Sequence, residues 1–231
     1  MSVYLSNIEL YYTKPENIQG STLVIDDSDV KHILKVMRHK IGDILFVTDG
    51  KGKIYEGEIK NINNDTVKIK PTKVREYNER FKNLTVCIPN IKKQNRLEFA
   101  IEKATELGIT NFIIFNSKRT INKKIKIERL NKVVLSAMKQ SLNSYLPKIT
   151  FFDSTTFLYN TNSEIILFEQ NVKNKFSNPS LKPNQKYYLL FGPEGGFEKE
   201  EIPNNLIISN FNLAPNRLRT ETAVVCAVSK I

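Results

Sequence analysis

The sequence has few of the residues that disulfide-stabilised, zinc-binding or membrane proteins need. Its 231 residues contain no tryptophan and two cysteines. Cys87 and Cys226 both lie in apolar segments without a CxxC or Cys/His spacing, so we expect reduced structural thiols. No apolar run approaches a membrane span, and MSVYLSNIELYY has neither the basic start nor the apolar core of a signal peptide. We therefore expect a cytoplasmic protein that needs neither a metal nor a membrane.

The common phosphate-binding motifs are also missing. FGPEGGFEKEEI, residues 191–202, ends an apolar run and leads into an acidic segment that we expect to start a helix. It contains neither GxxxxGK(S/T) nor GxGxxG. Glutamates crowd the expected helix N-terminus and would repel a pyrophosphate, which disfavours ATP and NAD. A ligand that is neutral or cationic at this loop, such as S-adenosylmethionine, fits better. A purely structural turn is an equally good interpretation of the loop alone.

Positive charge is concentrated in one part of the chain. The formal net charge is +11. Residues 1–72 hold 10 basic and 10 acidic residues, whereas residues 73–132 hold 15 basic and 6 acidic ones. A lysine-rich proteome would spread such an excess evenly, so this distribution favours a polyanionic partner, most often nucleic acid.

The N-terminal part is predicted to be a small β-rich unit with one helix. Ser28 is a candidate N-cap, and Val30, Ile33, Leu34 and Met37 follow the helical i, i+3, i+4, i+7 spacing up to Gly42-Asp43. ILFVTDG, GKIYEGEIKNI and TVKIKPTKV read as short strands separated by turn residues. Pro71 and VREYNERFKN are expected to form a linker.

From about residue 73 onward, predicted strands alternate with helices. LTVCIPN, NFIIFNS, EIILFEQ, YYLLF and NLIISNFNL read as strands, while RLEFAIEKATELG, IERLNKVVLSAMKQSLN and TETAVVCAVSKI read as helices. This order predicts an α/β domain with a mostly parallel sheet. Thr220 is expected to cap the last helix.

LAPNRLRTETA, residues 213–223, places two arginines just after a predicted strand. Charged residues at the carboxyl end of a strand lie where open α/β sheets build their sites. Arg217 and Arg219 are therefore candidate functional residues, with a pair of solvated arginines as the alternative.

Together, GPEGGF and LAPNRLRTETA resemble the ribosomal RNA small subunit methyltransferase E family (RsmE) of the SPOUT superfamily. HILKVMRHKIGD, KKQNRLEFAIEKATELG, the KRT at 118–120 and AMKQSLNSYLPKI resemble further family segments in the same order. Three positions depart from the family pattern: Lys139 stands where glutamate is common, and Asn143 and Tyr145 stand where arginine is frequent. The resemblance covers the whole chain.

The resemblance implies a PUA-like RNA-recognition domain over residues 1–72 and a SPOUT methyltransferase domain with a deep trefoil knot over residues 73–231. It implies a homodimer that uses S-adenosylmethionine to methylate N3 of one uridine in small-subunit ribosomal RNA, on the assembled subunit. Because residues 1–72 carry no charge excess, we expect that domain to guide docking while residues 73–132 supply the electrostatic attraction. The alternatives are a SPOUT enzyme acting on another RNA and an inactive RNA-binding assembly factor.

The resemblance also assigns site residues. Uridine N3 must lose its proton before methylation, so Arg219 is expected to stabilise the anion, with Arg217 as second choice and Glu194 as the candidate for proton handling. The expected cofactor-binding residues are Leu167, Glu169, Phe191, Gly192, Pro193, Glu194, Gly195, Gly196, Leu213, Ala214, Leu218, Arg219, Thr220, Glu221 and Thr222. The expected RNA-binding residues are Arg38, Lys92, Lys93, Arg96, Lys118, Arg119 and Gln140, with Lys123 and Lys124 nearby.

Overall fold

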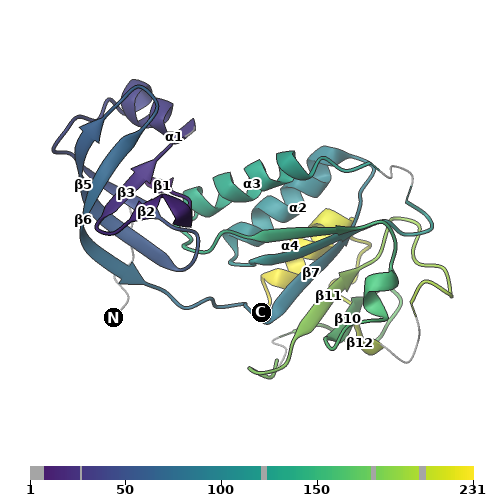
Figure 1. Ribbon diagram of the computed structural model, residues 1–231. Coiled ribbons are helices and arrows are strands. Elements are labelled where there is room, and N and C mark those ends of the chain that lie inside the picture. Colours follow the sequence, from purple (N-terminus) through teal and green to yellow (C-terminus); the bar gives the residue numbers. More distant parts are fainter. Residues whose placement is uncertain (1–7, 27, 121–123, 178–180, 203–206) are drawn as a thin grey trace. The chain divides into compact units, whose positions relative to one another are not determined.

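The structure is a computed structural model that describes residues 8–26, 28–120, 124–177, 181–202 and 207–231 (Figure 1). It forms two compact units. The first, unit 1, extends to Glu79 and also contains Met138–Leu146, and unit 2 comprises Arg80–Ala137 and Pro147–Ile231. The boundary that we expected between residues 72 and 73 falls inside a strand, and the compact units divide at Glu79 instead. Part of the later chain also packs into unit 1.

Unit 1 contains a six-stranded sheet in the order β1-β4-β5-β6-β3-β2. Alternating buried and exposed residues, clearest along β6, turn one face of the sheet toward a core around Tyr11, Ile25, Val47, Ile59 and Ile69. The β1–β4 pair is parallel, and the other neighbours are antiparallel. The strands are β1 Leu10–Tyr12, β2 Ile18–Gln19, β3 Thr22–Ile25, β4 Ile44–Thr48, β5 Lys53–Ile62 and β6 Val67–Glu76.

The helix of unit 1 is shorter than the sequence predicts. The short 3₁₀ turn η1, Pro15–Asn17, precedes β2; α1 covers Ser28–Lys31 and continues as the π-helical turn η2, His32–Val36. Val30 and Ile33 are buried as expected, but Met37 is 44% exposed. Arg38 has a φ of 57°, in the left-handed region, so the helix cannot continue to Gly42. The side chain of Ser28, the expected cap, is outside the described part of the structure.

Two of the three family departures help to complete unit 1. The Lys139 Nζ lies 2.6 Å from the Asp29 Oδ1. The Tyr145 hydroxyl donates a 2.9 Å hydrogen bond to the Tyr77 carbonyl. The same side chain lies over Gly52, whose φ is +104° and where an added Cβ would lie 2.5 Å from the Tyr145 hydroxyl oxygen. Lys139 and Tyr145 therefore hold the returning segment, Met138–Leu146, in unit 1.

Unit 2 is an all-parallel sheet in the order β12-β10-β11-β7-β8-β9. Strands β7, β8, β10 and β11 read as nearly continuous apolar runs because both of their faces are covered; Val86 and Cys87, neighbours in β7, are both 0% exposed. β9 is a strand that the sequence reading missed. The strands are β7 Leu84–Pro89, β8 Asn111–Phe115, β9 Lys148–Phe152, β10 Glu164–Phe168, β11 Tyr187–Phe191 and β12 Ile207–Phe211.

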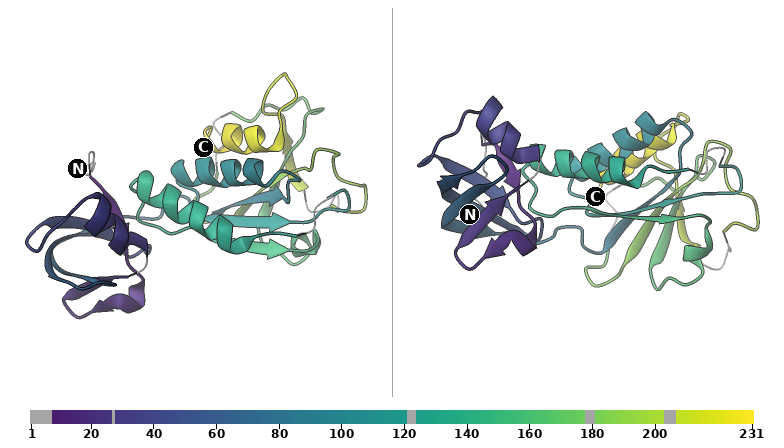
Figure 2. Two further views of the ribbon diagram at one scale, coloured as in Figure 1. Left: turned by 90° about the horizontal axis from the view of Figure 1, so that it is seen from above. Right: turned by 45° about the horizontal axis from the view of Figure 1, so that its top comes forward.

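In the described part of unit 2, three helices and one short turn accompany this sheet. The helices are α2 Gln94–Glu106, α3 Ile127–Gln140 and α4 Thr220–Val228. α2 and α4 pack side by side, and α4 also contacts β7 and β11 (Figure 2). The 3₁₀ turn η3, Thr156–Leu158, joins a buried cluster with Cys87, Phe115, Leu167 and Leu190. The expected α/β architecture is thus confirmed, and the trefoil knot stays a prediction.

Both cysteines are free in the structure, and burial raises the pKa of the Cys87 thiol. None of the helices in the described ranges is long and apolar enough to cross a membrane.

Candidate active site

The candidate site lies at one edge of the unit 2 sheet. Because all strands are parallel, the loops after β10, β11 and β12 leave from the same edge. Strand order reverses between β7 and β11: β8 and β9 follow on one side, and β10 and β12 on the other. Such a switch point is where open α/β sheets bind ligands. Here the three loops enclose a pocket of about 950 Å³.

Most of the expected cofactor residues border this pocket. Leu167 does not, because it is buried inside β10 at 3% exposure, and neither Glu221 nor Thr222 reaches the pocket wall. The expected residues that do line it are Glu169, Phe191, Gly192, Pro193, Glu194, Gly195, Gly196, Leu213, Ala214, Leu218, Arg219 and Thr220. Motif residues 44 or more positions apart in the sequence, such as Glu169 and Leu213, are thereby brought to one cavity.

Hydrogen bonds tie the loop after β12 to the loop after β11. The Thr220 hydroxyl donates to the Gly192 carbonyl at 3.2 Å. Arg217 donates from its Nη2 to the Glu194 carbonyl at 3.1 Å. Thr220 is therefore not the N-cap that the sequence suggested; it is the first residue of α4, and Arg219 holds the cap position. The Thr220 hydroxyl instead fixes the spacing of the two loops.

Asparagines of the pocket were missed by the sequence reading. The Asn212 side chain donates to the Gln170 carbonyl at 2.8 Å and accepts from the Ala214 N–H at 3.0 Å. It therefore links the loop after β10 to the loop after β12. A signal was available, because Asn212 directly follows a strand that ends at the same edge. The sequence reading also missed other residues that line the pocket: Gln170, Asn171, Val172, Phe197 and Asn216.

Arg96, which we expected to contact RNA, forms two ion pairs at the pocket. Its Nη1 lies 2.9 Å from the Glu194 Oε1, and its Nε lies 3.4 Å from the Glu221 Oε1. Its side chain is 20% exposed and lines the pocket. Arg96 thus joins the glycine loop to the start of α4. Within the described residues, the buried Glu221 Oε2 has no hydrogen-bond partner.

The acidic segment after the glycine loop forms a turn, and the predicted helix there is wrong. The Glu201 N–H donates to the Glu198 carbonyl at 3.0 Å. The Glu201 carboxylate, on a residue 4% exposed, accepts from the N–H groups of Lys118 at 2.6 Å and Glu198 at 2.9 Å. The repulsion expected at a helix N-terminus therefore does not apply, although Glu194 and Glu169 still place carboxylates at the pocket.

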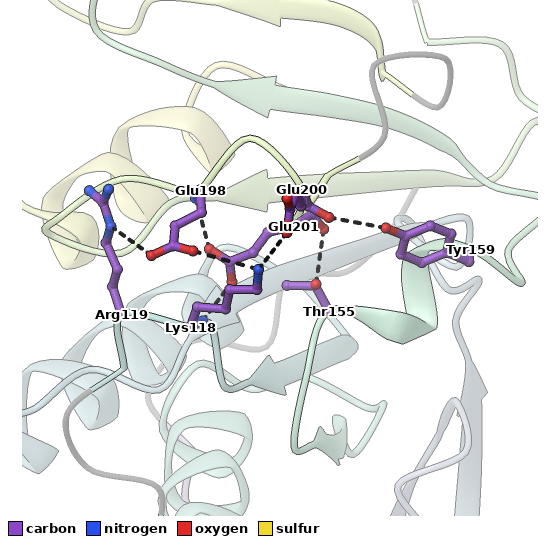
Figure 3. A network of polar contacts seen from close by, with 7 residues as sticks. All are labelled: Lys118, Arg119, Thr155, Tyr159, Glu198, Glu200 and Glu201. Carbon is purple, nitrogen blue, oxygen red and sulfur yellow. Dashed lines mark hydrogen bonds and ion pairs between the residues drawn. The ribbon is translucent and has the colours of Figure 1, made fainter.

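Lys118 and Arg119, which we expected to meet RNA phosphates, contact this acidic turn in the structure (Figure 3). The Lys118 Nζ lies 3.0 Å from Glu200 and 3.6 Å from Glu198. The hydrogen bond to Glu200 raises the pKa of the Lys118 ammonium group. Arg119 pairs with Glu198 at 3.8 Å and donates from its Nη1 to the Gly195 carbonyl.

The other expected RNA contacts are exposed and divided between the units. Arg38 and Gln140 belong to unit 1, whereas Lys92 and Lys93 directly precede α2 in unit 2. Lys123 lies outside the described residues.

The three catalytic candidates come together at the pocket. Arg219 and Arg217 are exposed residues of its wall, and Glu194 has a side chain 61% exposed that pairs with Arg96. An arginine stays protonated in proteins, so these two can stabilise an anion but cannot serve as ordinary bases. The arrangement offers backbone groups and carboxylates for a ligand and two cations for a developing negative charge.

Known proteins share this organisation. Residues 78–231 match the RNA methyltransferase domain family, and residues 25–72 match the RNA methyltransferase PUA domain. A ribosomal RNA small subunit methyltransferase E of Rickettsia conorii is 30% identical over 215 residues, which cover 89% of this chain and 86% of the relative. The Bacillus subtilis protein of the same name is 28% identical over 95% of this chain and 93% of its own length.

Solved structures of rRNA methyltransferases share the fold of the whole chain. A ribosomal RNA small subunit methyltransferase E from Neisseria gonorrhoeae, bound to S-adenosyl methionine, superposes with a TM-score of 0.81 at 26% identity, over 96% of both chains. A probable rRNA-methyltransferase from Porphyromonas gingivalis superposes with a TM-score of 0.82 at 27% identity, over 96% of both chains. The chain therefore belongs to the ribosomal RNA small subunit methyltransferase E family.

Proposed function

We propose that this protein transfers a methyl group from S-adenosylmethionine to N3 of one uridine in small-subunit ribosomal RNA, on the assembled subunit. The observation that carries the proposal is the single pocket formed by the loops after β10, β11 and β12, with two arginines on its wall. The Neisseria gonorrhoeae relative, with S-adenosyl methionine bound, supports the choice of cofactor.

The pocket residues fit this cofactor. A volume of about 950 Å³ is ample for a nucleoside with an amino-acid tail. Phe191, Leu213 and Leu218 provide apolar surface, and the turn from Gly192 to Gly196 brings backbone groups close to the ligand. Glu169 and Glu194 suit a cationic ligand and would repel a pyrophosphate.

When bound, S-adenosylmethionine supplies a methyl group on a positively charged sulfur. The chain must then orient the uridine and stabilise it without its N3 proton. We assign that stabilisation to Arg219, which is exposed at the pocket wall and free of the loop hydrogen bond that holds Arg217. Arg217 positions the Glu194 backbone, and the Glu194 carboxylate is our candidate for accepting the proton.

We assign docking on the ribosomal subunit to unit 1 and electrostatic attraction to the basic residues of unit 2. The PUA match over residues 25–72 supports an RNA-recognition role for unit 1. The exposed Lys92 and Lys93 are the best candidates for phosphate contacts in unit 2. We also propose that the protein works in the cytoplasm as a homodimer.

The test is methyl transfer from labelled S-adenosylmethionine to small subunits isolated from cells that lack the enzyme, followed by mass spectrometry of the nucleosides. We expect 3-methyluridine in the ribosomal RNA of assembled subunits and much less in naked RNA. Label in transfer RNA or large-subunit RNA instead would favour a different RNA substrate. Cofactor binding without transfer to any RNA would favour an inactive assembly factor.

A further inference from the structure

Glu201 is a buried carboxylate outside the pocket that the proposed chemistry does not use. It lies in the acidic turn, residues 198–201, that follows the glycine loop, residues 192–197. Its side chain accepts two backbone hydrogen bonds, from Lys118 and Glu198, and its carbonyl accepts one from the Thr155 hydroxyl at 2.9 Å (Figure 3). One residue therefore joins the loops that follow β8, β9 and β11.

We propose that Glu201 is a positioning residue that holds the glycine loop in its cofactor-binding shape. The inference rests on the proposed function, because it assumes that the loop contacts S-adenosylmethionine. Glu201 itself is absent from the pocket wall and acts through the two backbone segments that it fixes.

The first connection runs through the loop after β8. Glu201 fixes the Lys118 N–H, and the next residue, Arg119, reaches back to donate to the Gly195 carbonyl. The stem of Arg119 also lies against Gly195, where an added Cβ would be 3.2 Å from the Arg119 Cδ. A displacement of Lys118 would therefore be transmitted to the centre of the glycine loop.

The second connection runs along the acidic turn itself. Glu201 fixes the N–H of Glu198, two residues after Gly196. Gly196 has a φ of +73°, which a residue without a side chain adopts at little cost but also leaves easily. The two connections thus link one carboxylate to the Gly195 carbonyl, through Lys118 and Arg119, and to the Glu198 N–H.

Apolar contacts anchor the same loop but cannot orient its peptide groups. Phe197 stacks on Phe115 with ring centroids 6.1 Å apart and an interplanar angle of 15°. Ile202 is buried in the cluster with Phe157 and Leu158. Such contacts are non-directional, whereas a ligand held through backbone groups needs donors and acceptors in fixed directions. If Glu201 already holds the glycine loop in its binding shape, ligand binding does not have to order the loop, and affinity is higher.

The primary test is Glu201→Gln, with Glu200→Gln as the matched control. Glutamine keeps the size of the side chain, but its NH₂ group would face one of the two N–H donors, so one bond is lost. We expect S-adenosylmethionine, titrated by calorimetry, to bind about tenfold more weakly to Glu201→Gln. Glu200 has an 85% exposed side chain in the same turn, so Glu200→Gln should bind within about twofold of the unsubstituted protein.

A readout of catalysis separates positioning from general destabilisation. At saturating cofactor, Glu201→Gln should keep kcat within about twofold while KM for S-adenosylmethionine rises about tenfold. A kcat that falls together with the thermal midpoint, at unchanged cofactor affinity, would overturn the proposal.

Arg119→Gln keeps the proposal testable if Glu201→Gln fails to fold, because the Arg119 side chain is 49% exposed. We expect weaker cofactor binding in this variant as well, and a smaller effect of Glu201→Gln when both substitutions are combined, since both act on Gly195. Unchanged cofactor affinity in Arg119→Gln, or strictly additive effects, would contradict the connection through Arg119. Failure of the unsubstituted protein to bind S-adenosylmethionine would contradict the proposed function itself, whatever the variants show.

Discussion

The loops after β11 and β12 meet at the same pocket but are built in opposite ways. The loop after β11 is acidic and fixed from outside: Glu194 by Arg96, Gly195 by Arg119 and Glu201 by the Lys118 N–H. The loop after β12 carries Arg217 and Arg219, both exposed. Its hydrogen bonds to the first loop come from Thr220 and Arg217.

This difference separates two tasks. A loop that binds a ligand through its backbone must keep one shape, and fixing it in advance lowers the cost of binding. A cation that stabilises a developing charge must instead reach the reacting atoms. We therefore expect substitutions that loosen the first loop to change cofactor affinity, and substitutions in the second to change the rate of transfer.

The largest expected effect is that of Arg219→Ala. Removing the cation that we assign to the uridine anion should lower kcat about 100-fold or more, with S-adenosylmethionine affinity changed less than about threefold. Single-turnover transfer at saturating cofactor measures this directly. An unchanged rate would show that Arg219 does not stabilise the transition state. It would also contradict the assignment of the transfer rate to the loop after β12.

Arg96→Met should have the next largest effect, and it should change cofactor affinity where Arg219→Ala changes kcat. It breaks both ion pairs and leaves Glu221, a residue 8% exposed, without its cation. We expect about tenfold weaker cofactor binding and a loss of about 2 kcal/mol in the free energy of unfolding. Calorimetric titration and denaturant unfolding measure the two effects.

Arg129→Met is the matched control for that experiment. Arg129 also pairs with a glutamate of α2, Glu98 at 2.5 Å, but its side chain is 58% exposed. Its loss leaves Glu98, whose side chain is 13% exposed, without this cation, so the free energy of unfolding should also fall, by about 1 to 2 kcal/mol. Cofactor affinity should stay unchanged, because neither Arg129 nor Glu98 lines the pocket. Equal effects of the two substitutions on cofactor affinity would mean that Arg96 has no special connection with the pocket.

The double substitution Lys92→Ala with Lys93→Ala should weaken RNA binding without changing the pocket. Each lost phosphate contact lowers the slope of log K against log salt by about 0.7 to 0.9, so we expect a decrease of about 1.5. Binding of small subunits measured over a range of salt concentrations gives this slope. A constant slope would show that Lys92 and Lys93 do not contact RNA phosphates.

Thr220→Val should give the smallest effect. Valine keeps the volume but removes the hydroxyl that donates to the Gly192 carbonyl. One neutral hydrogen bond contributes about 1 kcal/mol, so cofactor affinity should fall about fivefold, measured by calorimetry. Thr222→Val, at an exposed position of the same helix that does not line the pocket, is the control and should bind normally.

Local patterns in the sequence predicted most elements of unit 2 and the segments that border the pocket. The apolar runs of β7, β8, β10 and β11 identified the buried strands, and the glycine and arginine motifs marked the ends of β11 and β12. Such features depend on residues that are close in the sequence. The strands and loop motifs could therefore be predicted from short segments of the sequence.

Long-range pairing explains what the sequence reading missed. Residues 198–202 have helix-favouring glutamates, but the Glu201 carboxylate binds the Lys118 N–H, 83 positions away. The sequence around Arg96 likewise does not reveal its ion pair, because the partner, Glu194, lies 98 positions away. Met138–Leu146 is joined to unit 1 by distant contacts such as the Lys139–Asp29 pair, 110 positions apart. No local pattern contains this information.

The placement of Met138–Leu146 also affects how RNA binding should be divided between the units. A fragment of residues 1–72 would end within β6 and lack the segment that holds Tyr145 against Gly52. The contribution of each unit to RNA binding is therefore better measured with substitutions in the full chain, such as those at Lys92 and Lys93, than with a fragment of residues 1–72.

The most direct test of the account is calorimetric titration of the full chain with S-adenosylmethionine, with ATP and NADH as controls. We expect binding of S-adenosylmethionine alone, and its loss of affinity in Arg96→Met but not in Arg129→Met. Binding of ATP or NADH in its place, or equal affinity in the two arginine variants, would contradict the claim that the fixed acidic loop after β11 forms a methyl-donor pocket.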